Sequence, residues 1–216
     1  MKKGILLTAT ILGSLFVSAQ AVAGASANIG ATSNYIWRGQ EQAAGSGAFS
    51  AGLDYEADNG LYVGAWASSL RAGEEVDVYG GYAKELENGV SYDVGAIKYV
   101  YPSTSGDFAE VYGKLGYKGV EAEVDYTVDK DGASTDEGDV YYALGYSGDL
   151  PQNWSYGAKV GRYNYKAAGT TDLTNVQLSA TKSFDKAGDF TFAIDDLSGA
   201  GNDPLYSVSW GKSFDF

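Results

Sequence analysis

The sequence predicts an all-β fold, a closed antiparallel transmembrane β-barrel of about 12 strands that follows a cleaved signal peptide. Three observations lead to this prediction. The chain opens with a basic and then apolar leader, continues with segments that alternate apolar and polar residues, and ends on an aromatic residue, Phe216. Alternation with a period of two sorts side chains onto the two faces of a strand, and no helix sorts them in this way.

The leader has the three parts of a secretory signal peptide. Met1, Lys2 and Lys3 form its positive end, an apolar run covers residues 5–17, and Ala21-Val22-Ala23 fits an A-x-A cleavage site. The run is shorter than the roughly 20 apolar residues that a transmembrane helix needs. We therefore expect residues 1–23 to be removed and residues 24–216 to form the barrel.

Composition excludes several functions. The chain has a net charge of -13, no cysteine and no histidine. Nucleic-acid phosphates would repel so acidic a chain, and the missing residue types remove Ser–His and Cys–His nucleophiles and His/Cys zinc sites. Paired carboxylates that hydrolyse glycosides remain an alternative, but Glu121 and Glu123, two apart on a strand, are better explained as a solvated face. We predict neither an enzyme nor a bound cofactor or metal.

The predicted strands follow one another along the rest of the chain. The clearest is Gly119–Asp129, in which every second residue is apolar or tyrosine and the others are polar. Most segments are close to the roughly 9–11 residues that cross a bilayer at a tilt. Similar alternation, of varying regularity, occurs near residues 25–38, 49–56, 60–70, 76–83, 89–101, 109–117, 139–146, 153–165, 173–180, 189–197 and 204–216.

The connections alternate in length. DNG at 58–60, ENG at 87–89 and KG at 118–119 are tight hairpin turns, whereas QEQAAGSG, PSTSGD, DKDGASTDEG and SGAGNDP are longer polar links. This alternation favours short periplasmic turns, longer outer loops and two periplasmic termini. The segments at 147–153 and 185–189 should lie at the periplasmic end, yet they are not predicted to be tight.

The C-terminal strand carries aromatic residues on one face, and in a barrel it must pair with the first strand. The spacing Ser209-x-Gly211-x-x-Phe214-x-Phe216 resembles the C-terminal signal of outer-membrane barrels. We therefore expect Ser209, Gly211, Phe214 and Phe216 to be recognised by the barrel-assembly machinery. The residues expected on the lipid-facing row are Tyr206, Val208, Trp210, Phe214 and Phe216.

The polar faces of the strands supply the candidate pore-lining residues. Acids outnumber bases on these faces, which would favour cations in an open pore. The candidates are Arg38, Asp54, Asp77, Asp93, Glu110, Lys114, Glu121, Glu123, Asp125 and Lys159. The further acids expected on the same side are Glu56, Glu85, Asp139 and Asp195.

Tyrosine and tryptophan are expected in two places. Some suit the membrane interface, because their rings are apolar and their tips polar; these are Tyr62, Trp66, Tyr92, Trp154, Tyr156 and Trp210. Others are expected to point inward, where they either fill the lumen or stack on sugars or other flat solutes; these are Tyr79, Tyr112, Tyr141, Tyr163 and Tyr165.

The acidic segment Asp129–Asp139 has a composition that could suit calcium. An EF-hand loop needs glycine at its sixth position and glutamate at its twelfth, and Gly132 is only the fourth residue of this segment. We therefore expect a solvated acidic loop rather than a calcium site.

The segment Thr32–Gln42, TSNYIWRGQEQ, resembles the opening motif of the TorF-type porins, a proteobacterial outer-membrane family of unknown function. The most specific residues are Ser33, Asn34, Tyr35, Trp37, Arg38 and Gly39. The likeness continues through residues 52–69, 75–83, 91–102 and 110–117. One departure is Gln40-Glu41-Gln42, where members commonly have an Ile-Ser-Gln-like segment. The resemblance implies an outer-membrane pore, without catalytic residues or an established solute.

Three functions remain compatible with the sequence. The first is a narrow, cation-preferring diffusion channel in a bacterial outer membrane, with lipid, the assembly machinery and small solutes or ions as partners. The second is a closed barrel with a structural or adhesive role through its outer loops. The third is a soluble secreted acidic β-protein. Barrels of about 8 strands are filled by side chains and those of about 16 or more hold a channel, so about 12 strands leave conduction open.

Overall fold

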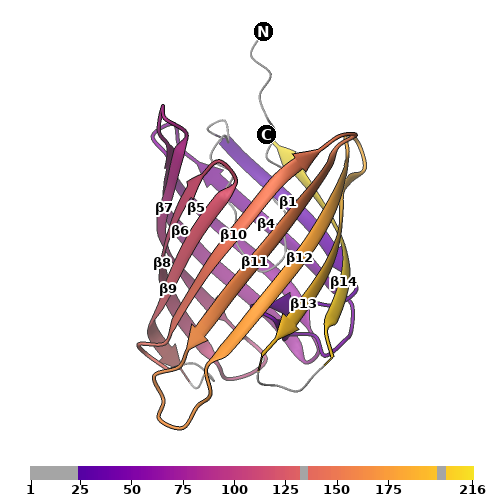
Figure 1. The fold of residues 1–216 in the computed structure, drawn as a ribbon. Helices are drawn as coiled ribbons and strands as arrows, with labels where there is room; N and C mark the ends of the chain where they lie inside the picture. The colour runs from indigo at the N-terminus through magenta and orange to yellow at the C-terminus, as the bar shows by residue number, and fades with distance from the viewer. Residues whose placement is uncertain (1–23, 132–135, 199–202) are drawn as a thin grey trace.

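The computed structural model describes residues 24–131, 136–198 and 203–216, and it confirms the predicted closed barrel (Figure 1). The predicted signal peptide, residues 1–23, lies outside the described residues. Within them no helix is long and apolar enough to cross a membrane. The strands follow sequence order around the barrel, and every neighbouring pair is antiparallel.

Twelve strands make the barrel wall, and two very short ones form a separate hairpin. The wall strands are β1 (Gly24–Thr32), β4 (Ala48–Glu56), β5 (Leu61–Leu70), β6 (Gly73–Glu85), β7 (Val90–Val100), β8 (Asp107–Tyr117), β9 (Val120–Asp131), β10 (Val140–Leu150), β11 (Trp154–Asn164), β12 (Leu173–Phe184), β13 (Gly188–Leu197) and β14 (Leu205–Asp215). The hairpin consists of β2 (Ile36–Trp37) and β3 (Gln40–Glu41).

The barrel closes where β1 pairs with β14. Their register places Gly30 opposite Gly211 and Thr32 opposite Ser209. Beyond the ladder, the Phe216 amide donates to the Ala25 carbonyl at 3.0 Å. The C-terminal strand therefore leaves no free edge, and both chain ends of the barrel lie at one rim (Figure 1).

The two faces of the wall differ in polarity as the alternation predicts. On β9, Val124 is 49% exposed on the outside, whereas Asp125, the next residue, is only 4% exposed on the inside. The same outward exposure is found for Leu53, Leu144, Leu178, Phe192 and many other large apolar residues of the described chain. Most of the large inward side chains are polar or aromatic. The barrel thus has an apolar exterior and a polar interior, which is the reverse of a soluble β-protein.

The two rims carry different connections. We call the rim that holds Gly24 and Phe216 the terminal rim and the opposite one the loop rim. The terminal rim has only short turns, at 57–60, 86–89, 118–119, 151–153 and 185–187. The prediction for 147–153 and 185–189 was therefore wrong, because β10 extends into the first segment and β13 into the second, which leaves turns of three residues. The loop rim has the longer connections, except for a two-residue turn at 71–72.

Two further predictions need correction. The first strand was expected to cover residues 25–38, but β1 ends at Thr32 and the chain then turns into the barrel. Tyr62 and Trp66 were expected at the membrane interface, but both point inward. Their place on β5 follows from its alternation, since Leu61, Val63 and Ala65 take the outer face.

Arginine at adjacent positions of β12 tests the assigned faces. Leu178 is 53% exposed on the outer face, and Ser179, the next residue, is half-buried on the inner face. In lipid, Leu178→Arg should lower the free energy of unfolding by about 2–4 kcal/mol, the cost of a base near the bilayer midplane. Ser179→Arg should cost clearly less, because its charge faces the polar interior. Equal losses for both variants in denaturant titrations would contradict this register.

Candidate functional site

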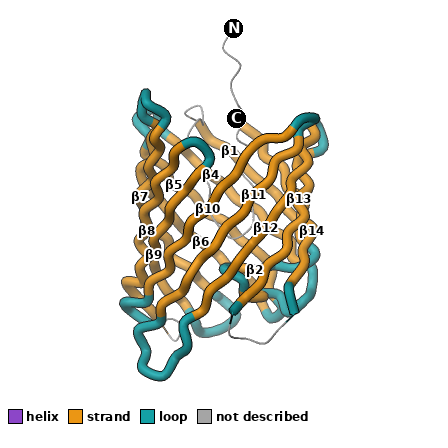
Figure 2. Tube along the Cα trace, in the orientation of Figure 1, coloured by secondary structure: helices purple, strands orange, loops and turns teal. Residues whose placement is uncertain are grey.

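The segment between β1 and β4, residues 33–47, folds into the barrel, and we call it the lumen loop. Its β2–β3 hairpin lies between the walls rather than outside the rim (Figure 2). Only two residue pairs form its ladder, Ile36 with Glu41 and Trp37 with Gln40. Ile36 is 3% exposed and Ala43 is 1% exposed, so the loop is packed against the interior.

The tip of the lumen loop is a tight turn formed by Arg38 and Gly39. Both have positive φ, 49° and 80°, as the two central residues of a type I′ hairpin turn require. A Cβ on Gly39 would lie 2.7 Å from Cβ of Asn175 on β12 and 3.0 Å from Cδ1 of Leu197 on β13. Glycine is therefore required at this position for two reasons: its backbone has a positive φ, and a side chain would collide with the wall.

Arg38 binds the tip to the wall through a buried ion-pair network. Its Nη1 and Nη2 donate to Oε1 and Oε2 of Glu110 at 2.8 and 2.9 Å. Nη2 also lies 3.3 Å from Oδ2 of Asp125. Arg38 is 8% exposed and Glu110 is 1% exposed, so solvent hardly screens this bidentate pair.

Aromatic rings enclose the guanidinium of Arg38. Its Cζ lies 4.3 Å from the ring centroid of Trp37, 4.2 Å from that of Tyr141 and 5.3 Å from that of Tyr163. All three distances are within cation–π range. The Tyr99 hydroxyl donates to Oε2 of Glu110 at 3.2 Å and holds that carboxylate in place. The Arg38 guanidinium therefore contacts both carboxylates and aromatic ring faces.

The base of the lumen loop is attached to other strands of the wall, β14 and β6. Ser33 makes two hydrogen bonds with Val208 of β14. The Ser33 amide donates to the Val208 carbonyl at 2.8 Å, and the Val208 amide donates to the Ser33 hydroxyl at 2.9 Å. The Tyr35 hydroxyl donates to Glu75 of β6 at 3.1 Å, and the Tyr35 ring meets Trp66 edge-on at 5.8 Å. The loop thus crosses the lumen from β1 and β14 to β8 and β9, with a further attachment to β6.

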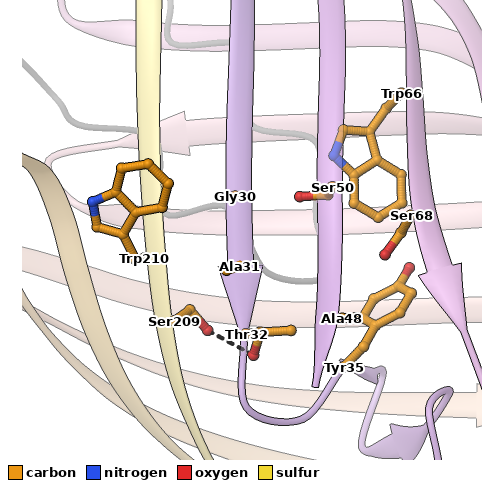
Figure 3. Close-up of a pocket in the computed structure, with 10 residues that line it drawn as sticks. All are labelled: Gly30, Ala31, Thr32, Tyr35, Ala48, Ser50, Trp66, Ser68, Ser209 and Trp210. Carbon is orange, nitrogen blue, oxygen red and sulfur yellow. Dashed lines mark hydrogen bonds between the residues drawn. The ribbon is translucent and has the colours of Figure 1, made fainter. Parts of the chain in front are cut away.

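A small cavity of about 40 Å³ lies between the loop base and the wall (Figure 3). Tyr35 and Trp66 flank it with rings, and Ser50, Ser68 and Ser209 contribute hydroxyls. At its edge, the Ser209 hydroxyl donates to Oγ1 of Thr32 at 2.9 Å. A volume of this size holds a few water molecules rather than a solute.

Nearer the terminal rim, the lumen contains further acids that bond to bases or tyrosines. Lys114 pairs with Glu123 at 3.6 Å. The Tyr62 hydroxyl donates to Asp93 at 2.7 Å, and the Tyr79 hydroxyl donates to Asp54. These groups lie on neighbouring strands of one side of the barrel, β4 to β9.

Apart from Arg38, the residues predicted to line the pore lie on the inner face of the wall. Asp77, Asp93, Glu110 and Asp125 are buried there, and Asp54, Lys114, Glu121, Glu123 and Lys159 are half-buried. Arg38 was expected to lie on a wall strand, but it reaches the lumen from the lumen loop. Glu85 was expected to face the lumen, but it is exposed near the terminal rim.

Several inner residues were not among the sequence candidates. Glu75 is 2% exposed and bonds to Tyr35, and Asn175 is 2% exposed beside Gly39. The alternation alone could have found both, because Glu75 shares the parity of Asp77, and Asn175 that of Gln177. No pattern in the sequence indicates that the lumen loop packs against Glu75 and Asn175.

The other predicted groups lie as follows. The motif residues Ser33, Asn34, Tyr35, Trp37, Arg38 and Gly39 make up the first half of the lumen loop. Of the assembly-signal residues, Ser209 points inward, whereas Phe214 and Phe216 are exposed on the outside. The inward tyrosines are packed against one another or bonded to acids, with Tyr163 stacked on Tyr165 at 4.6 Å.

The acidic segment 129–139 lies only partly within the described residues, because 132–135 fall outside them. Asp139 is 1% exposed and accepts hydrogen bonds from the amides of Asp136 and Lys166, at 2.7 Å each. In the described parts of the chain, no cluster of three or more acidic side chains has the arrangement of a metal site.

A family comparison identifies the lineage of the chain. A model of the Gcw_chp family, described as a bacterial protein of unknown function, matches residues 18–212. The chain belongs to the Gcw_chp family. The match covers both the wall and the lumen loop, and it does not confirm the TorF-type name, which stays a resemblance. No relative was found among curated protein sequences.

Solved structures with a similar fold are outer-membrane porins. The KdgM porin aligns with a TM-score of 0.62 at 9% identity, over 88% of this chain and 99% of its own. KdgM in complex with disordered oligogalacturonate aligns with a TM-score of 0.60 at 8% identity, over 89% and 99%. The NanC porin aligns with a TM-score of 0.54 at 14% identity, also over 89% and 99%. At these identities the likeness concerns the fold alone.

Alanine at Gly39 should release the lumen loop. The substitution strains a left-handed residue by about 1–3 kcal/mol and also places a methyl group against Asn175. Trypsin should then cleave after Arg38, which is protected in the wild-type barrel, and the new fragment beginning at residue 39 can be read by mass spectrometry.

Gly45→Ala is the matched control for this experiment. Gly45 also has positive φ, 73°, but its Cβ would meet only Oε1 of Glu41 at 3.9 Å. It should leave Arg38 protected. Cleavage after Arg38 in the control but not in Gly39→Ala would mean that tip packing does not hold the loop.

Proposed function

We propose that the chain forms a diffusion channel in a bacterial outer membrane, narrowed by the lumen loop and preferring cations. The observation that carries this proposal is the closed wall with an apolar exterior and charged side chains on its interior. A wall of this kind suits lipid outside and water inside. The porin fold of the similar structures supports the same function, and the predicted leader supports export from the cytoplasm.

The distribution of charge supports a preference for cations. The three inner bases lie together, Lys114 on β8, Lys159 on β11, and Arg38 bound to β8 and β9. The acids of β4 and β6 face the lumen among tyrosines instead, as Asp54 does with Tyr79 and Glu75 with Tyr35. An acid-rich wall of low dielectric constant favours positive ions in a narrow passage.

This charge also limits the solutes that the channel is expected to accept. One structurally similar porin was solved with oligogalacturonate, a polymer of sugar acids. A lumen in which acids outnumber bases would repel such a polyanion. We therefore propose small cations and small uncharged or cationic solutes, and not acidic oligosaccharides.

A closed barrel remains the second candidate, and one observation favours it. The lumen loop crosses the interior and is bound at both sides, by Ser33 to Val208 of β14 and by Arg38 to Glu110 of β8. A soluble protein is the weakest candidate, because a water-exposed apolar exterior of this extent would promote association.

Gel electrophoresis and planar-bilayer recording separate these three functions. The proposal predicts a detergent-dependent protein that migrates differently before and after heating and gives discrete conductance steps. A heat-modifiable protein that inserts without conducting would support the closed barrel. Extraction from cells without detergent would support the soluble protein and end the channel proposal.

Removing inner acids should weaken the cation preference. Asp54→Asn combined with Glu56→Gln neutralises two half-buried acids of the inner face of β4. The reversal potential under a salt gradient should move towards zero, and more strongly at low salt, because charges are screened within about 8–10 Å at physiological salt. Glu137→Gln with Asp196→Asn removes the same charge from exposed positions and should change little. An anion-selective wild-type channel would overturn the proposed preference.

Phe216 tests the proposed assembly signal. Phe216→Ala should reduce the amount of barrel inserted in the membrane of cells, since this residue ends the signal and is 82% exposed. Phe184→Ala removes another exposed outer aromatic, 47% exposed at the terminal rim, without touching the signal. If both variants insert equally well, recognition does not depend on the terminal aromatic residue.

A further inference from the structure

The barrel wall contains a binding site for a guanidinium group, which the chain fills with its own Arg38. We propose that Glu110, Asp125, Tyr141 and Tyr163 bind guanidinium-bearing solutes, which compete with Arg38 for this site and thereby release the lumen loop. The regulatory part of the inference rests on the proposed channel function. The binding part does not, and it is tested separately below.

The site is built by the wall and not by the loop. Glu110 lies on β8, Asp125 on β9, Tyr141 on β10 and Tyr163 on β11, four strands that are hydrogen-bonded in succession. From β7, Tyr99 donates a hydrogen bond to Glu110. Because these strands belong to the closed barrel, the carboxylates and rings keep their places when Arg38 leaves.

The geometry favours guanidinium over other cations. Both oxygens of Glu110 accept parallel bonds, at 2.8 and 2.9 Å, from the two terminal nitrogens of one planar group. The Tyr141 ring lies 4.2 Å from its central carbon. An ammonium group is a point charge and cannot make this fork. Two carboxylates face the single guanidinium, Glu110 through the fork and Asp125 at 3.3 Å from Nη2.

Arg38, which occupies the site, is carried by a short hairpin. The β2–β3 ladder has two residue pairs, and a short two-stranded hairpin is marginally stable in water. Arg38 and Trp37 place the tip against β8–β11, while Tyr35 and Ser33 hold the loop base elsewhere. A solute that replaces Arg38 would therefore detach the tip and leave the base attached. The concentration of guanidinium solutes would thus set how far the loop obstructs the lumen.

Emptying the site by Arg38→Ala gives the direct test, with methylguanidinium as the probe. The wild type and the variant are purified in detergent, and their thermal unfolding is followed with millimolar methylguanidinium. Methylurea, which has a similar shape without charge, and methylammonium, which has charge without the fork, are the matched control ligands. We expect the Tm of Arg38→Ala to rise with methylguanidinium concentration, because a ligand that binds only the folded state stabilises it. The controls should produce little or no rise.

Two variants show that the rise comes from this site. Arg38→Ala with Glu110→Gln should lose the rise in Tm, because the bidentate acceptor is gone. The wild type should show a smaller rise than Arg38→Ala, since Arg38 competes for the same groups. If Arg38→Ala fails to fold, Arg38→Lys takes its place, because lysine keeps the charge near Asp125 but leaves the fork of Glu110 unfilled. No methylguanidinium-specific rise in either variant would overturn the proposal.

Bilayer recording then tests the regulatory part. In Arg38→Ala, conductance should be higher than in the wild type, because the loop tip is already released. In the wild type, methylguanidinium should raise the conductance by displacing Arg38, and methylurea and methylammonium should not. A rise in Tm without any conductance would support the site and refute the channel. Conductance without a rise in Tm would leave the channel standing and refute the site.

Discussion

The pairing of β1 with β14 is the constraint on which the rest of the structure depends. A strand that ends a sheet leaves unpaired amides and carbonyls, and these cannot be left unpaired in a hydrocarbon environment. Closure satisfies both edges and brings the start of β1 and the end of β14 to one rim. It also determines where the lumen loop begins, because Ser33 bonds to Val208 directly after the last pair of the ladder. The chain therefore leaves β1 beside β14 and turns into the barrel.

The buried charge of Arg38 determines where the loop ends. A buried guanidinium is tolerated only with partners, and removing one partner of a buried ion pair costs about 3–5 kcal/mol. Glu110 and Asp125 supply these partners from adjacent strands. Arg38 in turn gives these two inner acids a counter-charge at ion-pair distance. The position of the loop tip therefore depends on the acids of the wall, and two of these acids depend on the loop for their ion-pair partner.

The tyrosines have different roles on the two faces of the wall. Outside, exposed rings such as Tyr55 and Tyr206 can place their hydroxyls near polar surroundings. Inside, a buried hydroxyl needs a hydrogen-bond partner, and the acids provide it, as Asp93 does for Tyr62. The inner acids therefore serve the packing of the tyrosines as well as the charge of the lumen. In the interior, tyrosine hydroxyls and carboxylates thus satisfy one another's hydrogen-bonding groups.

The sequence alone determined most strands of the wall, the two faces of the regularly alternating ones and the closure. Period-two alternation carries this information locally, as Val124 and Asp125 illustrate, because each residue faces opposite to its neighbours along the strand. Alternation also places Glu110 and Asp125 on the inside. It could not show that Arg38 contacts them, since Arg38 is 72 residues from Glu110 and lies outside any wall strand. Only the closed barrel brings them together, because a loop has no period from which its direction can be read, and the curvature of the wall decides which side chains it meets.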